Sequence, residues 1–480
     1  MLFLRADGTV RGFTKITEGL GGFGGTSPDF GSFGSGLAFL GDLDGDGVDD
    51  LAIGQPGITS PFGTGAGVLW ICFMNRDGTV KAEQAIGSAQ GGFGGQLDIG
   101  DGFGRSIAVL GDMDADGFLE IAVGAPRDDD GGGQVNDSAG AVWILSLHAD
   151  GTVARTLKIS GTAGGLIGPL DSIAAFGTAV ATLGDLDGDG VRELAVGLPL
   201  QGPSAHGQVW ILNLDSMGRV IGETHLGDGL GGVVGPVGRE FGRALASAGD
   251  LEGKGSTSLV VGATHFIPFE TFQRGDFFVL HLDANGLATG EVFVTTGSGG
   301  FTPVIEQGDY FGFGAGPVGD RDGDGRSEVA VGAPNLLGSA SPGRVFLIAL
   351  EGVPNPADAV VRNGSHSNPL CYRATSLPSL GTTFTAEIDT TSQGGSAVLT
   401  LIAGYGSALG PLGSSYGEIL VDPTSDLILS SGKAPVAGIG VHGIPVPNDI
   451  GLLGFTLYTQ GVLLGGGASL CNAIDLVVGN

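Results

Sequence analysis

Short apolar runs, separated by glycine- and aspartate-rich turns, dominate the first 350 residues of this chain. Four of them follow one another at Leu37–Gly41, Leu51–Gln55, Val68–Phe73 and Val80–Ile86. Each run has the length of a strand, and the Asp-Gly pair before the fourth is typical of a hairpin turn. No segment keeps apolar residues at helical spacing over three turns. The pattern therefore predicts an all-β fold built from four-stranded antiparallel units.

The four-strand unit repeats along the chain. A Phe-Gly pair, an acidic loop and a Gly-Ala-Pro-like strand end recur in that order. The aspartates that open the acidic loops lie 70, 73, 65 and 70 residues apart, at Asp42, Asp112, Asp185, Asp250 and Asp320. The glycines of the hairpin turns keep nearly the same period, at Gly8, Gly78, Gly151, Gly218 and Gly286. Because the first three strands of each unit are apolar on both faces, each sheet is expected to stack between neighbouring sheets. This combination predicts a β-propeller of about five blades.

The two ends of the chain depart from the period. Residues 1–17 match the last two strands of a unit without its first two, so we expect a partial N-terminal blade. We interpret it as a truncation that removed an upstream piece carrying a signal peptide; closure of the ring onto the last blade is the alternative. The propeller is expected to span 1–352, followed by a Pro/Asn/Ser-rich linker at 353–368 and a small antiparallel β-sandwich at 369–480.

Charge and composition narrow the functions that this chain can have. The formal net charge is −30, from 51 acidic and 21 basic residues, so phosphate backbones would be repelled and nucleic acid is not an expected partner. No apolar run reaches the length of a transmembrane helix. Of the three cysteines, Cys72 lies in a predicted strand, where we expect a buried free thiol. Cys371 and Cys471 lie near the two ends of the predicted sandwich and are a possible disulfide in an exported protein.

The acidic loops have the spacing of a cation site. With Asp42 as position 1, carboxylates fall at positions 3, 5 and 9, a glycine at position 6 allows the sharp turn, and the Val48 carbonyl is available at position 7. Position 12 is Ile53, inside the next strand, where an EF-hand would place a glutamate. We therefore predict calcium hairpins between strands. The expected ligands are Asp42, Asp44, Asp46, Val48 and Asp50; Asp112, Asp114, Asp116, Phe118 and Glu120; Asp185, Asp187, Asp189, Val191 and Glu193; and Asp320, Asp322, Asp324, Arg326 and Glu328.

The fourth loop differs from the other four. It carries Asp250 and Glu252, but Lys254 stands where an anionic ligand is needed. Our hypothesis is that the Lys254 ammonium replaces the ion by a salt bridge, so about four calcium sites are expected. The alternative for all these loops is that they are solvated, Asp-rich turns. Carboxylates this close repel one another unless a cation lies among them, which favours the calcium interpretation.

The phrase Phe-Gly, then Gly-Asp-x-Asp-Gly-Asp-Gly, then Gly-Ala-Pro resembles the FG-GAP repeat. That repeat is found in the N-terminal propeller of integrin α-subunits and in many bacterial extracellular proteins, and the resemblance covers roughly residues 1–350. It implies a propeller with calcium loops on one rim and adhesion or ligand binding at the opposite face. The loops between the second and third strands on that face vary between repeats: 58–67, 126–140, 200–207, 264–275 and 335–343.

These observations together predict an extracellular or cell-surface calcium-binding propeller that binds a protein or glycan ligand and is not an enzyme. The chain contains a G-x-S-x-G sequence at 413–417, but no strand-to-helix context surrounds it. Two alternatives stay open. The propeller is a non-catalytic part of a larger secreted hydrolase or lyase, or it is a structural component of a surface layer.

Overall fold

The computed structural model describes two compact units, Met1–Leu350 and Glu351–Asn480. The residues described are 1–5, 9–26, 31–57, 65–130, 138–202, 206–234, 236–251, 256–264, 274–320, 327–334, 343–350, 358–362, 371–376, 382–391, 399–405, 408–414, 417–421, 427–436, 439–446, 456–464 and 468–477. Regular structure in these ranges consists of strands. None of them contains a helix that is long and apolar enough to cross a membrane.

Four sheets in the first unit share one topology. The first contains β3 (Leu37–Gly41), β4 (Asp50–Gln55), β5 (Val68–Met74) and β6 (Val80–Ile86), paired antiparallel in chain order. These bounds agree within one residue with the strands predicted from the sequence. The next three sheets are β7 (Ile107–Gly111), β8 (Leu119–Ala125), β9 (Ala141–Leu147) and β10 (Val153–Ile159); β11 (Ala179–Gly184), β12 (Glu193–Leu198), β13 (Gln208–Leu214) and β14 (Val220–Gly227); and β15 (Phe241–Gly249), β16 (Thr257–Ala263), β17 (Asp276–Leu282) and β18 (Ala288–Val294).

The fifth sheet and the N-terminal sheet are smaller. The fifth contains β19 (Gly314–Gly319), β20 (Glu328–Ala333) and β21 (Arg344–Ile348). Near the N-terminus, β1 (Leu2–Leu4) pairs with β2 (Val10–Phe13) in a two-stranded sheet. The fifth sheet therefore takes its third strand, β21, from its own repeat, and the N-terminal strand β1 is not part of that sheet. Met1 and Ile16 pack against the first sheet, on a cluster that contains Leu51 and Cys72.

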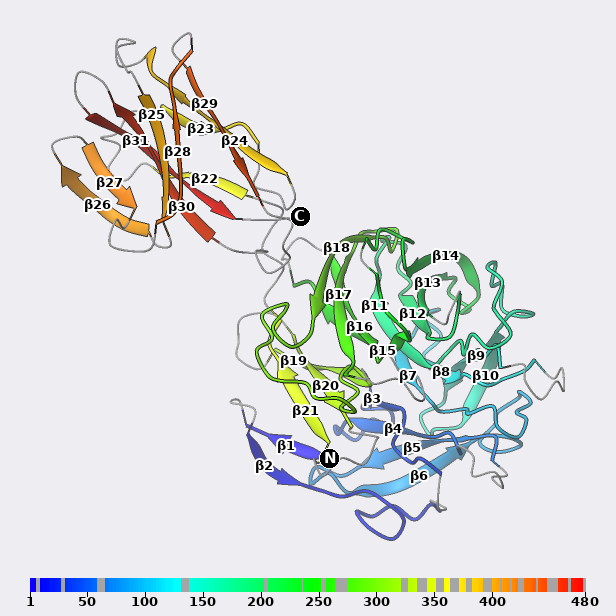
Figure 1. Ribbon diagram of the computed structural model, residues 1–480. Coiled ribbons are helices and arrows are strands. Elements are labelled where there is room, and N and C mark those ends of the chain that lie inside the picture. Colours follow the sequence, from blue (N-terminus) through cyan, green and yellow to red (C-terminus); the bar gives the residue numbers. More distant parts are fainter. Residues whose placement is uncertain are drawn as a thin grey trace. The chain divides into compact units, whose positions relative to one another are not determined.

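Successive sheets share their hydrophobic cores, as blades of a propeller do. One core joins Ile71 and Leu69 of β5 to Ile121 of β8 and Trp143 of β9, and equivalent cores lie between the later sheets. Strands β8 and β9 are buried along almost their whole length. Both faces of a middle strand are covered because a blade lies on each side, which explains the nearly continuous apolar runs. Figure 1 shows these sheets arranged around a common centre, with β7, β11 and β15 on the inside.

The Phe-Gly pairs tie each blade to the one before it. Phe103 donates its backbone N–H to the Ala66 carbonyl at 3.0 Å, and Phe176 donates to Ala139 at 2.9 Å. The glycine of the next Phe-Gly pair also touches the Gly-Ala-Pro-like strand end: a Cβ built on Gly124 of β8 would lie 2.0 Å from the Gly177 carbonyl oxygen. Both glycines are therefore needed for the close approach of two backbones.

The second unit contains two antiparallel sheets and a hairpin. The larger sheet has the order β22 (Asp358–Arg362), β31 (Ala468–Val477), β30 (Thr456–Leu464), β25 (Leu399–Tyr405) and β28 (Leu427–Lys433). The smaller has β23 (Tyr372–Ala374), β24 (Thr383–Asp389) and β29 (Ile439–Pro445), and the hairpin pairs β26 (Ala408–Ser414) with β27 (Gly417–Val421). Both sheets contribute to one core, with Phe384 and Ile388 from one and Ile402 and Ile474 from the other.

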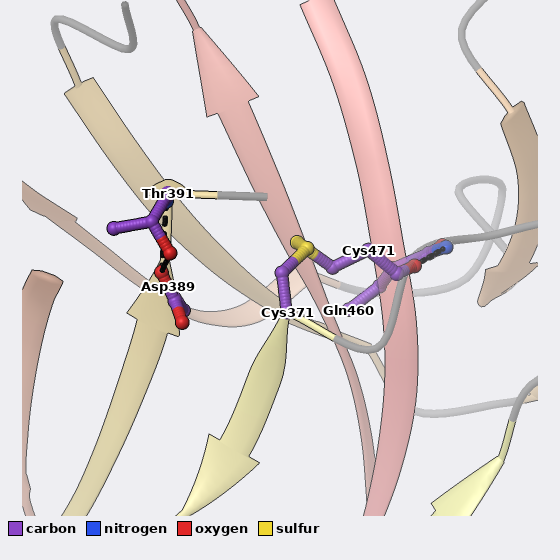
Figure 2. The surroundings of a disulfide bond; sticks show 5 residues. All are labelled: Cys371, Asp389, Thr391, Gln460 and Cys471. Atoms are coloured by element: carbon purple, nitrogen blue, oxygen red, sulfur yellow. Dashed lines mark hydrogen bonds between the residues drawn. A yellow bond between two sulfur atoms is a disulfide. The ribbon is translucent and has the colours of Figure 1, made fainter. Parts of the chain in front are cut away.

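One part of the predicted domain organisation needs correction. The segment expected to be a linker, 353–368, includes β22, which pairs antiparallel with β31 along its whole length. The Ala-Val-Val sequence at the centre of β22 favours a strand, although Pro and Asn residues are frequent around it, and β22 forms the edge of the sheet. Cys371 and Cys471 are disulfide-bonded, with their Cα atoms 5.5 Å apart. Figure 2 shows this bond beside Gln460, whose side-chain amide donates to the Cys471 carbonyl at 2.9 Å.

Candidate metal centre

Asp42, the first residue of the first acidic loop, organises the backbone of the connection between β3 and β4. Its carboxylate accepts hydrogen bonds from the N–H groups of Asp46 and Gly47, each at 2.8 Å. Gly47 has a φ of 82°, a conformation that glycine adopts without strain. The second and third loops repeat the arrangement, because Asp112 and Asp185 each accept from the loop glycine five residues further on, at 3.0 and 2.9 Å. The loop is therefore folded around the carboxylate at position 1.

The acidic residue at position 9 lies beneath the loop, at the start of the second strand of the blade. Asp50 is fully buried and accepts from the N–H groups of Leu43 at 3.1 Å and Met74 at 2.9 Å. Glu120 and Glu193 likewise accept a hydrogen bond from the backbone N–H at position 2 of their loops. The donors are Met113, at 2.8 Å from Glu120, and Leu186, at 2.5 Å from Glu193. Burial raises the pKa of Asp50 and Glu120, and raises the pKa of Glu193 to about 7. A nearby cation would hold these carboxyl groups in the charged form.

Three groups of carboxylates converge within the described residues. In each, one oxygen from every member lies within 4.8 Å of the others, and the members are Asp42, Asp44 and Asp50; Asp112, Asp114 and Glu120; and Asp185, Asp187 and Asp189. The predicted ligands Asp46, Asp116 and Glu193 are not in these groups. Asp46 and Asp116 instead accept from the N–H of the residue at position 7, Val48 and Phe118, each at 2.9 Å. Val191 makes the matching contact to Asp189 at 2.7 Å.

The second loop contains two buried acceptors without a hydrogen bond. The oxygens Asp114 Oδ1 and Glu120 Oε1 are buried and receive no hydrogen bond from the described residues, and Arg155 Nη2 lies 3.6 Å from Glu120 Oε1. A buried acceptor without a donor is costly, and a cation is one group that satisfies it. The chemistry of the donor set and these open oxygens therefore fit a hard divalent ion.

Basic side chains from the fourth strand of the blade reach two of the loops. Lys81 of β6 lies 2.7 Å from Asp44 and also pairs with Asp46, and both carboxylates hold the pKa of Lys81 above its usual range. Arg155 of β10 lies 2.9 Å from Asp114, and its contact lowers the pKa of that carboxyl. Both basic residues lie outside the loops, so the spacing of the acidic residues does not predict these contacts.

The repeats of this chain are similar in sequence to those of known proteins. The FG-GAP repeat family matches residues 33–72, 103–145 and 176–212, each match beginning at the phenylalanine of a Phe-Gly pair. Integrin alpha-PS2 of Drosophila melanogaster is 31% identical over 230 residues, which are 46% of this chain and 14% of that protein. Human integrin alpha-IIb is 35% identical over 170 residues, 34% of this chain and 14% of its own length. Three repeats of this chain thus match the FG-GAP repeat, and the strands that they contain form blades of the first unit.

The similarity covers a limited part of the relatives. Integrin alpha-V of Gallus gallus is 27% identical over 226 residues, which are 47% of this chain and 19% of that protein. The matched stretch is thus less than a fifth of each of these three integrin chains. The family matches include the acidic loops of the first three repeats.

The fourth and fifth repeats are described only in part. Residues 252–255 and 321–326 lie outside the described residues, so the hypothesis on Lys254 and the predicted ligands Asp322, Asp324 and Arg326 cannot be placed. At position 9 of the fifth loop, Glu328 is buried like its counterparts. At position 9 of the fourth, Ser258 is buried and pairs with His281 Nδ1 at 2.9 Å. A serine and a histidine thus stand where the other loops bury a carboxylate.

Proposed function

We propose that this FG-GAP propeller binds Ca²⁺ in its acidic loops and displays a ligand-binding surface at the opposite end. The observation that carries the proposal is the convergence of three carboxylates in the acidic loop of three successive blades, at positions 1, 3 and 9 in the first two loops and at positions 1, 3 and 5 in the third. Solvated turns have no reason to repeat such a convergence, since like charges repel. The proposed function is adhesion or recognition of a protein or glycan ligand outside the cell, without catalysis.

The residues that would hold each ion come from both ends of a loop. In the first loop these are Asp42, Asp44 and Asp50, with Asp46 and the Val48 carbonyl as further oxygen donors. Calcium accepts six to eight oxygens in flexible geometry, whereas magnesium keeps several waters and uses few carboxylates. A loop with four acidic residues and a carbonyl therefore favours calcium. The ion would neutralise the loop and fix the turn between the first two strands of the blade.

The adhesive function is supported by the relatives and by the build of the scaffold. The similar curated proteins are integrin α-subunits, although each is matched over a small part of its length. The loops between the second and third strands differ in length and sequence while the blades stay constant, as expected of a rigid frame that presents a binding surface. Most of the residues in these loops lie outside the described ranges: 58–64, 131–137, 203–205, 265–273 and 335–342.

The test combines a calcium count with thermal unfolding. The full chain should bind about four calcium ions per molecule, and saturating calcium should raise the melting temperature relative to excess chelator, because each ion that binds only the folded state adds about 2.7 kcal/mol at a hundred times its dissociation constant. Asp44→Asn should remove one ion from the count. The matched control is Asp49→Asn in the same loop, which changes an exposed carboxylate outside the converging group. An unchanged melt and no bound calcium would refute the proposal.

A further inference from the structure

A cavity of about 920 Å³ lies at the centre of the propeller. The innermost strands of all five sheets line it, and these strands neighbour one another in chain order, β3 beside β7, then β11, β15 and β19. Cavities of about 300–1,000 Å³ are the usual size of small-molecule sites. The residues that line the cavity belong neither to the acidic loops nor to the variable loops between the second and third strands.

One position of the repeat forms a layer around the cavity. The residue after each Phe-Gly pair lines it in every blade: Ser35, Arg105, Thr178, Arg243 and Phe313. This residue lies at the start of the innermost strand, and the acidic loop follows the end of the same strand. The layer therefore lies at the end of the cavity away from the acidic loops. Two of its five members are arginines, in a chain with a net charge of −30.

The two arginines bring positive charge together without a matching ion pair. In the described part of the chain, neither guanidinium forms a salt bridge, and Arg243 Nε is buried with no hydrogen-bond partner. Arg243 lies over the ring of Phe313, 4.6 Å from its centre. Burial, together with the charges of Arg243 and Arg127, lowers the pKa of Arg105 to about 10. Glu240 is the acidic residue whose charge acts on Arg243, and Thr264 already donates to it.

The hydroxyl groups of this layer are engaged elsewhere. Ser35 donates to the Ser32 carbonyl at 2.8 Å, and Thr178 donates to the Ala175 carbonyl at 2.7 Å. The arginines are therefore the donors of this layer that remain open toward the cavity. Guanidinium groups bind carboxylates and related oxyanions through paired N–H donors, and they bind them more strongly where water is partly excluded.

The wall beyond the arginines is apolar. Ile107 and Val109 follow Arg105 on β7, and Leu245 follows Arg243 on β15. On β3, Leu37 and Phe39 keep 59% and 63% of their surface exposed although they belong to an innermost strand. Large apolar side chains left open inside a concave space mark a ligand site more often than an unfilled core.

We propose that the central cavity binds a small organic anion with an apolar body, its oxyanion held by Arg105 and Arg243 and its body along the wall formed by β3, β7 and β15. This site goes beyond the proposed adhesive function, because it requires neither the variable loops nor a macromolecular partner. The arginine pair supplies the preference for an anion, and the apolar wall supplies the preference for chain length.

The test is isothermal titration of the full, calcium-saturated chain with octane-1-sulfonate, whose calcium salt stays soluble. We expect binding of one molecule per chain, about tenfold weaker for Arg105→Gln and for Arg243→Gln. Decane-1-sulfonate should bind roughly tenfold more tightly than the octane compound, because two further methylenes leave water. Octyltrimethylammonium, with the same body and the opposite charge, should not bind.

The matched control is Arg219→Gln, which removes an exposed arginine from a hairpin turn outside the cavity lining. It should leave the affinity unchanged. Thermal melts of the arginine variants show whether they fold, and loss of an unpaired buried charge should not lower the melting temperature. No binding of the sulfonates, equal binding of the ammonium compound, or full binding by the two arginine variants would overturn the proposal.

Discussion

Arg155 Nη1 lies 2.9 Å from Asp114 Oδ2, in the middle of the second acidic loop. The other guanidinium nitrogen, Nη2, lies 3.6 Å from Glu120 Oε1. Asp114 and Glu120 both belong to the converging group of that loop, so the arginine and a divalent ion would compete for the same oxygens. In the first loop, Lys81 contacts Asp44, one member of the converging group, and Asp46. The basic side chain therefore reduces the repulsion among the carboxylates when no cation is bound, and it opposes cation binding.

Replacement of Arg155 by glutamine should tighten calcium binding at the second loop. The competitor is removed, so we expect an affinity gain of about fivefold, corresponding to about 1 kcal/mol for a partly exposed ion pair. The same variant should melt at a lower temperature in chelator, because the carboxylates then repel one another without relief. Calcium titration calorimetry and paired melts measure both effects. Arg219→Gln is the control, and an unchanged calcium affinity in Arg155→Gln would contradict the competition.

Gly124→Ala should destabilise the contact between the second and third blades. The new Cβ would lie 2.0 Å from the Gly177 carbonyl oxygen, so one of two backbones must move. Forced overpacking of this kind costs about 1–3 kcal/mol. Gly161→Ala is the matched control, because a Cβ there meets only Leu170, at 3.9 Å. Chemical denaturation of the calcium-loaded chain measures both; equal stability of the two variants would show that the Phe-Gly and Gly-Ala-Pro glycines are not packed this tightly.

The blade strands could be predicted to within a residue because several local signals agree. Asp-Gly turns, acidic loops and apolar runs mark the limits of β3 to β6, and the period of about 70 residues confirms each limit in another repeat. The exclusion of an EF-hand also holds in the structure, since Ile53 at position 12 lies inside β4. Local sequence determines these features, so they can be read without knowledge of the fold.

The features that the sequence did not reveal depend on long-range contacts. Lys81 and Arg155 lie 35 and 41 residues from the aspartates they contact, on a strand whose register decides which side chain reaches the loop. Arg105 and Arg243 line one cavity because blades two and four face the same centre. Strand β22 was missed because its five residues pair with β31, which lies more than a hundred residues later in the chain.

Loss of the disulfide should weaken the second unit without affecting the propeller. The bond closes a loop of 100 residues, and the chain-entropy model assigns such a loop at most about 4.7 kcal/mol. The double variant Cys371→Ala with Cys471→Ala should therefore lower the melting transition that is insensitive to chelator. Cys72→Ala, which removes a buried free thiol from β5, should instead lower the transition that calcium raises. Calorimetry in calcium and in chelator separates the two transitions. A shift of the calcium-sensitive transition in the double variant, or of the chelator-insensitive transition in Cys72→Ala, would refute the assignment of the transitions to the two units.

Asp101 should make the stability of the propeller fall as pH rises toward neutrality. Its side chain is buried, with 4% of its surface exposed, and its carboxylate accepts one hydrogen bond from Asp98 N–H at 2.7 Å. Burial, with smaller contributions from Asp128 and Asp98, raises the pKa of Asp101 to about 7. The ordinary value for an unfolded chain is about 3.9.

The sign of the effect follows from proton binding. Between about pH 4 and 7 the folded state keeps a proton on Asp101 that the unfolded chain has lost. The stabilisation is therefore complete below the unfolded pKa and is lost as pH rises through the folded pKa, by at most about 4 kcal/mol. Asp101→Asn keeps an acceptor for the Asp98 N–H and should flatten the decline in unfolding free energy between pH 5 and 8. Measurements in saturating calcium keep the acidic loops constant, and the exposed Asp49→Asn is the control. If Asp101→Asn declined as steeply as the parent protein, another buried group would be responsible for the pH dependence.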